Sequence, residues 1–292
     1  MKREDFIKKG VISSLIAMVA PSVLKADPQP TSNENVASTN ANLGHNHMPN
    51  TNVKTMNTVL HKAGTRGSAD HGWLKVNHTF SFANYQNPDR MNFGALRVLN
   101  DDTISGGMGF NPHPHNNMEI ITIPLEGSIK HKDNMGNSSV IAHGDVQVMS
   151  AGKGVVHSEF NADEKDDLKL LQIWLFANKK NVEPRYQQIP IRDIETINEF
   201  YQILSPDQDD QGVWIHQNAW FHLGEFDQAK KVNYKIHASG NGIYAFVIKG
   251  KAQIENQSLE DRDGFGIWNT DSITIQAEGN SKILLMEVPM KI

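Results

Sequence analysis

The 292-residue chain contains no cysteine. This absence excludes disulfide bonds, thiol nucleophiles, and zinc or iron–sulfur sites held by cysteine, so any metal ion must be bound by nitrogen and oxygen. The chain also lacks an excess of positive charge: it has 28 Lys and Arg against 33 Asp and Glu, a net charge of −5. Such a chain lacks the excess of cations that neutralises phosphates, so its composition argues against a nucleic-acid partner.

The apolar stretch near the N-terminus, residues 10–20, is too short to span a bilayer, and we expect no stable membrane span. It follows a basic start and precedes Ala26, which fits a cleavage point, so residues 1–26 have the layout of a secretory signal. The start resembles the twin-arginine signal of exported bacterial proteins, although Glu4 stands in place of the second arginine. We predict export to the periplasm; the alternative is an amphipathic leader on a cytoplasmic protein.

Residues 27–54 are rich in Asn, Ser, Thr and Pro and have no apolar period. A segment of this composition cannot bury enough apolar surface to offset the entropy of ordering it, so we predict a disordered linker.

Long helical periods are missing from the rest of the chain. Short runs of strand length, such as HTFSF, MEIITIPL and LKLLQIWLF, alternate with turns rich in Gly, Asn and Asp. A second series of such runs occupies residues 213–290. Two series of short strands without helices predict an all-β protein with two barrels or sandwiches. We place one domain at 55–185 and the other at 186–292.

Four residues with metal-binding side chains occur as two pairs with a spacing of two. His113 and His115 form one pair, and His157 and Glu159 form the other. Residues two apart on a strand face the same way, and two antiparallel strands can bring both pairs together. Three imidazoles and one carboxylate suit Fe(II), Mn, Ni, Co or Cu and would accept Zn. The spacing therefore predicts a site for one divalent ion.

The same segments resemble the two motifs of the cupins, G-x5-H-x-H-x3,4-E-x6-G and G-x5-P-x-G-x2-H-x3-N. Two departures stand out. Glu119 and Gly127 are separated by one residue too many, and in the second motif Ser150 replaces the proline while four residues separate Gly152 from His157. Together these departures are typical of the pirin branch.

The resemblance to pirins covers residues 56–185, and it is carried by HTFSFANY, NFGALRVLNDD, HPHNNMEIITIPLEG and VMSAGKGVVHSEF. Residues 212–227 are similar to the C-terminal domain of the bacterial pirins called quercetinases. The resemblance implies a bicupin, that is, two cupin (double-stranded β-helix, or jelly-roll) barrels. It also implies that Glu159 is the fourth ligand beside the three histidines.

Other acidic and histidine side chains are given lesser roles. Glu119 shares the parity of His113 and His115, and we expect it to orient a ligand histidine. His131 and His143 lie in turn-rich segments, and we expect them to be solvated. The histidines of the second domain have spacings that make no ligand pair, so we expect a structural barrel without metal; they are His216, His222 and His237.

The family resemblance implies quercetin 2,3-dioxygenase activity, with an aromatic small molecule and O2 as substrates and Fe(II) as our expected ion. Glu159 is then the general base for the flavonol hydroxyl. The alternative is a non-enzymatic interaction protein of the pirin type that senses metal or redox state and modulates a partner protein, and a third possibility is a cupin enzyme, such as an isomerase, that binds a sugar or small acid. We expect a monomer.

Overall fold

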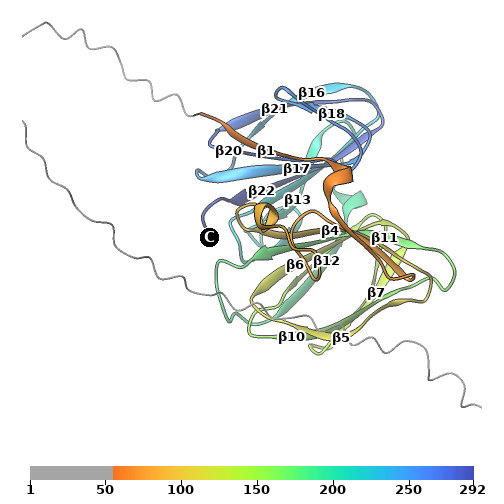
Figure 1. Cartoon of the computed structure of the whole chain (residues 1–292). Coiled ribbons are helices and arrows are strands. Elements are labelled where there is room, and N and C mark those ends of the chain that lie inside the picture. Colours follow the sequence, from red (N-terminus) through yellow and green to blue (C-terminus); the bar gives the residue numbers. More distant parts are fainter. Residues whose placement is uncertain (1–54) are drawn as a thin grey trace, which may run out of the picture. The chain divides into compact units, whose positions relative to one another are not determined.

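The computed structural model describes residues 55–292 (Figure 1). The predicted signal at 1–26 and the linker at 27–54 lie outside the described residues. Strands dominate residues 55–292, and the helices within this range are three single 3-10 turns at η1 (Ala63–Thr65), η2 (Pro88–Arg90) and η3 (Ile191–Asp193). None of the helices in this part of the chain has the length and apolar character needed to cross a membrane.

The first barrel combines a seven-stranded and a four-stranded sheet. The larger sheet has the order β12-β9-β6-β11-β4-β3-β2, and the smaller has the order β5-β10-β7-β8. Their bounds are β2 Gly67–Asp70, β3 Leu74–His78, β4 Leu96–Ile104, β5 Gly109–His115, β6 Met118–Glu126, β7 Ser128–Asp133, β8 Ser138–Ala142, β9 Asp145–Ser150, β10 Val155–Asn161, β11 Leu168–Phe176 and β12 Arg185–Pro190.

The second barrel repeats this plan with sheets β1-β20-β17-β22-β15-β13-β14 and β16-β21-β18-β19. Its bounds are β1 Asn57–His61, β13 Phe200–Ser205, β14 Val213–Trp214, β15 Trp220–Phe226, β16 Lys230–Lys235, β17 Asn241–Lys249, β18 Ala252–Ile254, β19 Gln257–Leu259, β20 Gly264–Trp268, β21 Ser272–Ala277 and β22 Ser281–Pro289. Each strand of one barrel has a counterpart at the same place in the sheet order of the other, with β1 and β12 at corresponding edges. The predicted all-β bicupin is confirmed.

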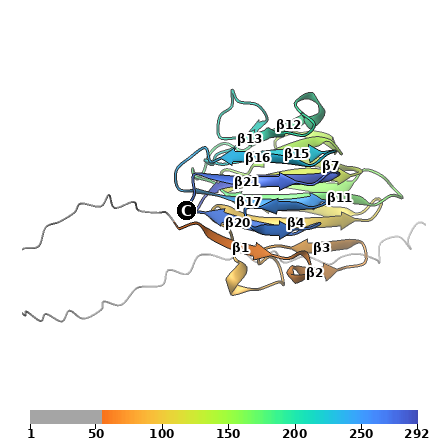
Figure 2. The same cartoon turned by 90° about the horizontal axis from the view of Figure 1, so that it is seen from above.

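Two strands cross the predicted domain boundaries. β1 precedes the first barrel in sequence but pairs antiparallel with β20 of the second barrel, as Figure 2 shows. β12 starts at Arg185 and pairs with β9 of the first barrel. Sheet membership therefore differs from the limits at 55–185 and 186–292. The first barrel includes β12, which lies almost wholly in 186–292, and the second barrel includes β1, which lies in 55–185.

The two large sheets share one apolar cluster. It contains Ile121 and Ile173 of the first barrel together with Phe246 and Leu284 of the second. Strand β11 reads LKLLQIWLF because Leu171, Ile173 and Leu175 enter this shared cluster, while residues of the other parity face the barrel interior.

The interiors of the two barrels differ in polarity. The second barrel holds one continuous apolar core, to which Ile243, Ile275 and Leu285 contribute. The apolar residues of the first barrel form two smaller groups. Its buried polar side chains include Asn100, Asp102, Thr122, His131, Asp133, Gln147, His157 and Glu159. Because buried polar groups are costly unless they have partners, such an interior indicates a functional site.

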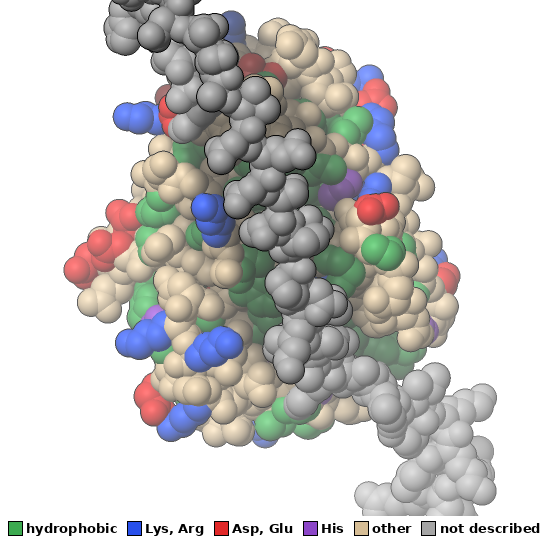
Figure 3. Space-filling view, turned by 60° about the vertical axis from the view of Figure 1, so that its left-hand side comes forward, with side chains coloured by type: hydrophobic (Ala, Val, Ile, Leu, Met, Phe, Trp, Pro, Cys, Tyr) green, Lys and Arg blue, Asp and Glu red, His purple; other side chains and the backbone are tan. Residues whose placement is uncertain are grey.

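The outer surface shows no field of one sign on the face drawn in Figure 3, where Lys and Arg side chains lie among Asp and Glu. The most exposed large apolar side chains of the described residues occur singly along the sequence, as at Met91, Val140 and Ile197.

Candidate metal centre

Strands β5 and β10 bring the two predicted pairs together. They pair antiparallel, with His157 opposite His113 and Val155 opposite His115. β5 is the edge strand of its sheet, where a strand tolerates the missing N–H groups of Pro112 and Pro114. The histidines of β5 therefore keep their spacing of two although prolines separate them.

The three imidazoles form one cluster. Ring centroids lie 4.4 Å apart for His113 and His157, 4.8 Å for His113 and His115, and 4.9 Å for His115 and His157. One candidate ligand atom of each residue lies within 4.8 Å of those of the other two. His157 is buried, with 2% of its surface exposed, and the other two are half-buried.

The hydrogen bonds of the cluster leave its Nε2 atoms available. Nδ1 of His113 lies 2.8 Å from the carbonyl oxygen of Asn111 and donates to it. Nδ1 of His157 faces Nδ1 of His131 at 3.5 Å, whereas its Nε2 is buried without a hydrogen-bond partner. A buried nitrogen without a partner is costly unless something binds it. These residues therefore fit a metal ion.

Burial and neighbouring charges keep His115 and His157 neutral. Burial, followed by repulsion from His157 and His113, lowers the pKa of His115 to about 3. Burial and the neighbouring His113 and His131 lower the pKa of His157 to about 3 as well. Neutral imidazole is the form that binds metal, so near pH 7 these two side chains are already in the ligating state.

Glu159 lies beside His157 but in a different group. A bulge between residues 157 and 159 interrupts the β5–β10 register, and a Cβ at Gly109 would collide with the backbone oxygen of Glu159. Nε2 of Gln172 donates to both carboxylate oxygens, at 3.2 and 3.3 Å. The ligand atoms of Glu159 group with His131 and His157 within 4.8 Å. The structure thus offers two overlapping sets of ligands that share His157.

His131 is not solvated, and that expectation is wrong. It is 1% exposed, and its Nε2 lies 3.3 Å from Oδ2 of Asp133. The signal was present in β7, SIKHKD, where Ile129, His131 and Asp133 alternate with exposed lysines. His143, in contrast, is exposed as expected. A chain of contacts therefore runs from His157 through His131 to Asp133.

Glu119 points away from the cluster. Asn117, with φ of 48°, turns the chain between β5 and β6, so parity along β5 does not continue into β6. Glu119 is fully buried and accepts a 2.6 Å hydrogen bond from Ser150, and among the described residues no hydrogen bond to a clustered histidine is formed. Burial raises its pKa to about 7. The partners of Glu119 thus differ from the expected ones, and sequence parity misplaced it.

Aromatic rings border the cluster. The ring of Trp174 lies edge-on to His115 at 4.9 Å and to Phe82 at 5.3 Å, and Phe110 lies 6.3 Å from His113. Trp174 and Phe110 are partly buried, whereas Met149 is fully buried in the core. The cluster therefore borders the aromatic rings of Trp174 and Phe110.

Fold and site together define a bicupin whose first barrel carries a histidine cluster suited to a metal ion. The model of the family described as Pirin matches residues 39–175, and that of the quercetinase C-terminal cupin domain matches residues 202–288. The chain belongs to the pirin family.

Individual relatives agree. The chain is 40% identical over 230 residues to "Quercetin 2,3-dioxygenase" of Escherichia coli (strain K12), an alignment that covers 79% of this chain and 98% of that relative. It is 38% identical to a "Pirin-like protein" of Caulobacter vibrioides, covering 76% of this chain and 95% of the relative. The crystal structure of bacterial pirin YhhW in complex with nickel(II), from Escherichia coli, matches with a TM-score of 0.76 and 38% identity, covering 80% of this chain and all of that one.

Proposed function

We propose that this protein is a metal-dependent dioxygenase that cleaves a flavonol in the manner of a quercetin 2,3-dioxygenase. The observation that carries the proposal is the cluster of His113, His115 and His157, with its buried Nε2 atom that lacks a partner. The relative from Escherichia coli named for this activity supports the choice of reaction.

The ligands in this proposal are the three histidines and Glu159, and the ion is Fe(II). Nitrogen and oxygen donors of this kind suit Fe(II), and they would also accept Ni, Mn, Co, Cu or Zn. When bound, the ion supplies a Lewis acid that favours the deprotonated form of the flavonol 3-hydroxyl. Metal analysis of protein purified from its own organism tests the choice of iron; a different stoichiometric ion would overturn it.

The chain's own residues position and deprotonate the substrate. Glu159 accepts the proton of the flavonol hydroxyl at a carboxylate oxygen, and Gln172 fixes that carboxylate by donating to both oxygens. The ring of Trp174, which packs edge-on against His115, offers a flat wall for the aromatic body of the substrate.

Oxygen uptake tests the proposal. Protein loaded with Fe(II), Ni(II) or Mn(II) is mixed with a panel of flavonols, and consumption of O2 is measured together with release of carbon monoxide. We expect both with at least one ion. The absence of both for every ion and flavonol would overturn the enzymatic proposal and favour the sensor.

Glu159→Gln separates the base from the ligand set. The variant should keep most of its metal and lose turnover, because the amide cannot take up the proton. Glu126→Gln is the matched control, since Glu126 is exposed and pairs with Lys169 on the surface. Full turnover by Glu159→Gln would remove the assignment of the base.

We also propose that residues 1–26 direct export to the periplasm and that the mature protein is a monomer without a nucleic-acid partner. The basic start followed by a short apolar stretch supports export. Cell fractionation with N-terminal sequencing tests the location, and light scattering tests the oligomeric state. Full-length protein confined to the cytoplasm, or a dimer in solution, would contradict the respective statement.

A further inference from the structure

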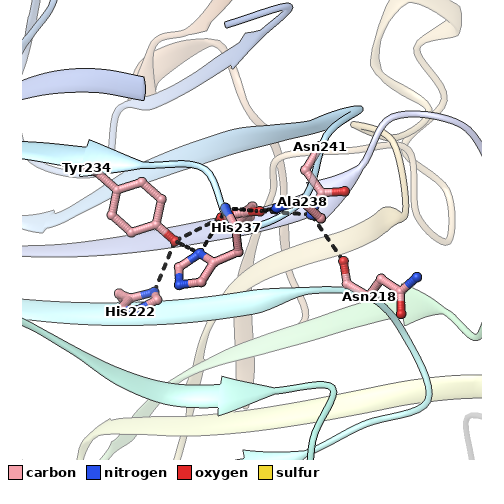
Figure 4. Close-up of polar contacts among 7 residues, drawn as sticks. Asn218, His222, Tyr234, His237, Ala238 and Asn241 are labelled. Atoms are coloured by element: carbon pink, nitrogen blue, oxygen red, sulfur yellow. Dashed lines mark hydrogen bonds and ion pairs between the residues drawn. The ribbon is translucent and has the colours of Figure 1, made fainter. Parts of the chain in front are cut away.

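The second barrel has a polar cluster at one end of its interior (Figure 4). His222 comes from β15, Tyr234 from β16 and Glu287 from β22, and His237 follows β16. The rings of His222 and His237 stack at 5.2 Å with 24° between their planes. Sequence spacing did not predict this pair, because His222 lies on β15 and His237 follows β16, and these segments meet only in the closed barrel.

Glu287 anchors the cluster. Its side chain is fully buried, and it accepts hydrogen bonds from the backbone N–H groups of His237 and Ala238, at 3.0 and 3.1 Å, and from the side chain of Asn241 at 2.9 Å. The hydroxyl of Tyr234 adds a further bond at 3.1 Å. With this many donors the carboxylate is satisfied within the protein and needs no ligand.

The hydrogen bonds fix where the imidazole protons lie. Nδ1 of His237 lies 2.8 Å from Glu287 and must donate to it. Tyr234 donates its proton to Glu287, so its oxygen accepts from Nδ1 of His222 at 3.1 Å. Burial, followed by the neighbouring His237, lowers the pKa of His222 to about 4, so this ring is neutral near pH 7.

Nε2 of the neutral His222 ring is left as a free acceptor. Among the described residues Nε2 of neither His222 nor His237 has a hydrogen-bond partner, and neither is among the fully buried atoms that lack one. In an imidazole ring Nε2 points away from Nδ1, so the Nε2 lone pair of His222 lies on the side of its ring opposite Tyr234. The cluster thus presents an oriented acceptor at His222.

A hollow of about 530 Å³ borders these rings. Phe200 and Val232 supply its apolar lining and His222, Tyr234 and His237 the rings of the cluster, and the remaining lining residues are Glu199, Lys230, Lys231, Asn233 and Lys235. Trp220 also stacks on His237, at 5.0 Å with 8° between the planes, so the His237 ring is nearly parallel to two neighbouring rings. A space of this size with an apolar wall and a few directed polar atoms is typical of a small-molecule site.

The position in the fold agrees. β15, β16 and β22 occupy the places in the second barrel that β4, β5 and β11 occupy in the first. β5 carries His113 and His115, so the two barrels place their histidine clusters on corresponding parts of the fold.

We propose that this hollow is a binding site for a small phenol, whose hydroxyl donates to Nε2 of His222 while its ring packs against Phe200 and Val232. Both sets of candidate metal ligands in the described residues lie in the first barrel, which disfavours an ion here. The proposal does not depend on the reaction at the first barrel.

The test is a nitrogen-15 titration of the zinc-loaded full chain with 4-methylphenol, observing the Nε2 resonances of His222 and His237. We expect a saturable shift of the His222 resonance. The probe 4-methylanisole has the same shape but no hydroxyl proton, and it should leave both resonances unchanged. An equal response to both probes, or a response to neither, would overturn the proposal, as would a shift confined to the histidines of the first barrel.

Variants locate the site. His222→Phe keeps a flat ring but removes the acceptor, and it should weaken binding of 4-methylphenol at least tenfold. Val232→Phe fills the hollow without touching the hydrogen bonds and should also abolish binding, which keeps the test valid if His222→Phe folds poorly. His143→Phe, at an exposed position in the first barrel, is the control. Unchanged binding by a folded Val232→Phe would place the phenol elsewhere.

Discussion

His131 controls how firmly His157 is held, and its replacement by phenylalanine should weaken metal binding. If His157 binds the ion through Nε2, its Nδ1–H donates to Nδ1 of His131, and Nε2–H of His131 then donates to Asp133. Loss of such a partner behind a ligand histidine costs about 10- to 100-fold in metal affinity. The Nδ1–Nδ1 distance of 3.5 Å is long for a hydrogen bond, so we expect the lower end, about tenfold or about 1.4 kcal/mol.

The fold should tolerate this change. Asp133 retains three other donors, the N–H groups of Met135 and Asn137 at 2.9 Å and the side chain of Asn137 at 2.8 Å, so no buried carboxylate is left without partners. Phenylalanine also fills a similar volume.

The assay is competition for Ni(II) against a chromophoric chelator at pH 7, with His143→Phe as the control. Unchanged affinity in His131→Phe would refute the role of the relay. A loss above about a thousandfold would also contradict it, because so large an effect indicates that His131 is itself a ligand.

Three further changes probe the stability of the scaffold. Burial, with Arg90 nearby, lowers the pKa of His61 from 6.5 to about 4, so the unfolded chain binds more protons than the folded one between these pH values. The free energy of unfolding should therefore be full above pH 6.5 and fall by about 3 kcal/mol as the pH drops to 4. His61→Gln should show a smaller fall in urea titrations. Ile275→Ala, in the core of the second barrel, should cost about 2–5 kcal/mol in the same assay, and a cost under 1 kcal/mol would contradict the close packing. The guanidinium carbon of Arg185 in β12 lies 3.9 Å from the ring centre of Trp214 in β14. Arg185→Met should therefore lower the free energy of unfolding by about 2 kcal/mol. A change no greater than that of the exposed Arg192→Met would remove this link between the barrels.

Period-two spacing was enough to predict the fold class and the convergence of His113, His115 and His157, because parity holds along an unbroken strand. The same rule misplaced Glu119, since Asn117 adopts a positive φ and starts a new strand with its own parity. His131 could have been found from the lysines that alternate with it in β7.

Contacts between distant strands could not be predicted in this way. The pairing of β1 with β20, and the stacking of His222 on His237, depend on how the barrels close. Local patterns of one strand carry no information on which strand lies across the barrel from it.

The central claim is that one ion is bound by His113, His115, His157 and Glu159. A crystal structure of the nickel-loaded protein, with anomalous diffraction at the nickel edge, tests it most directly, because two overlapping ligand groups share His157. We predict a single anomalous peak in contact with all four side chains. A peak bound by His131 and out of contact with His113 and His115, or no ordered peak in the first barrel, would contradict the account.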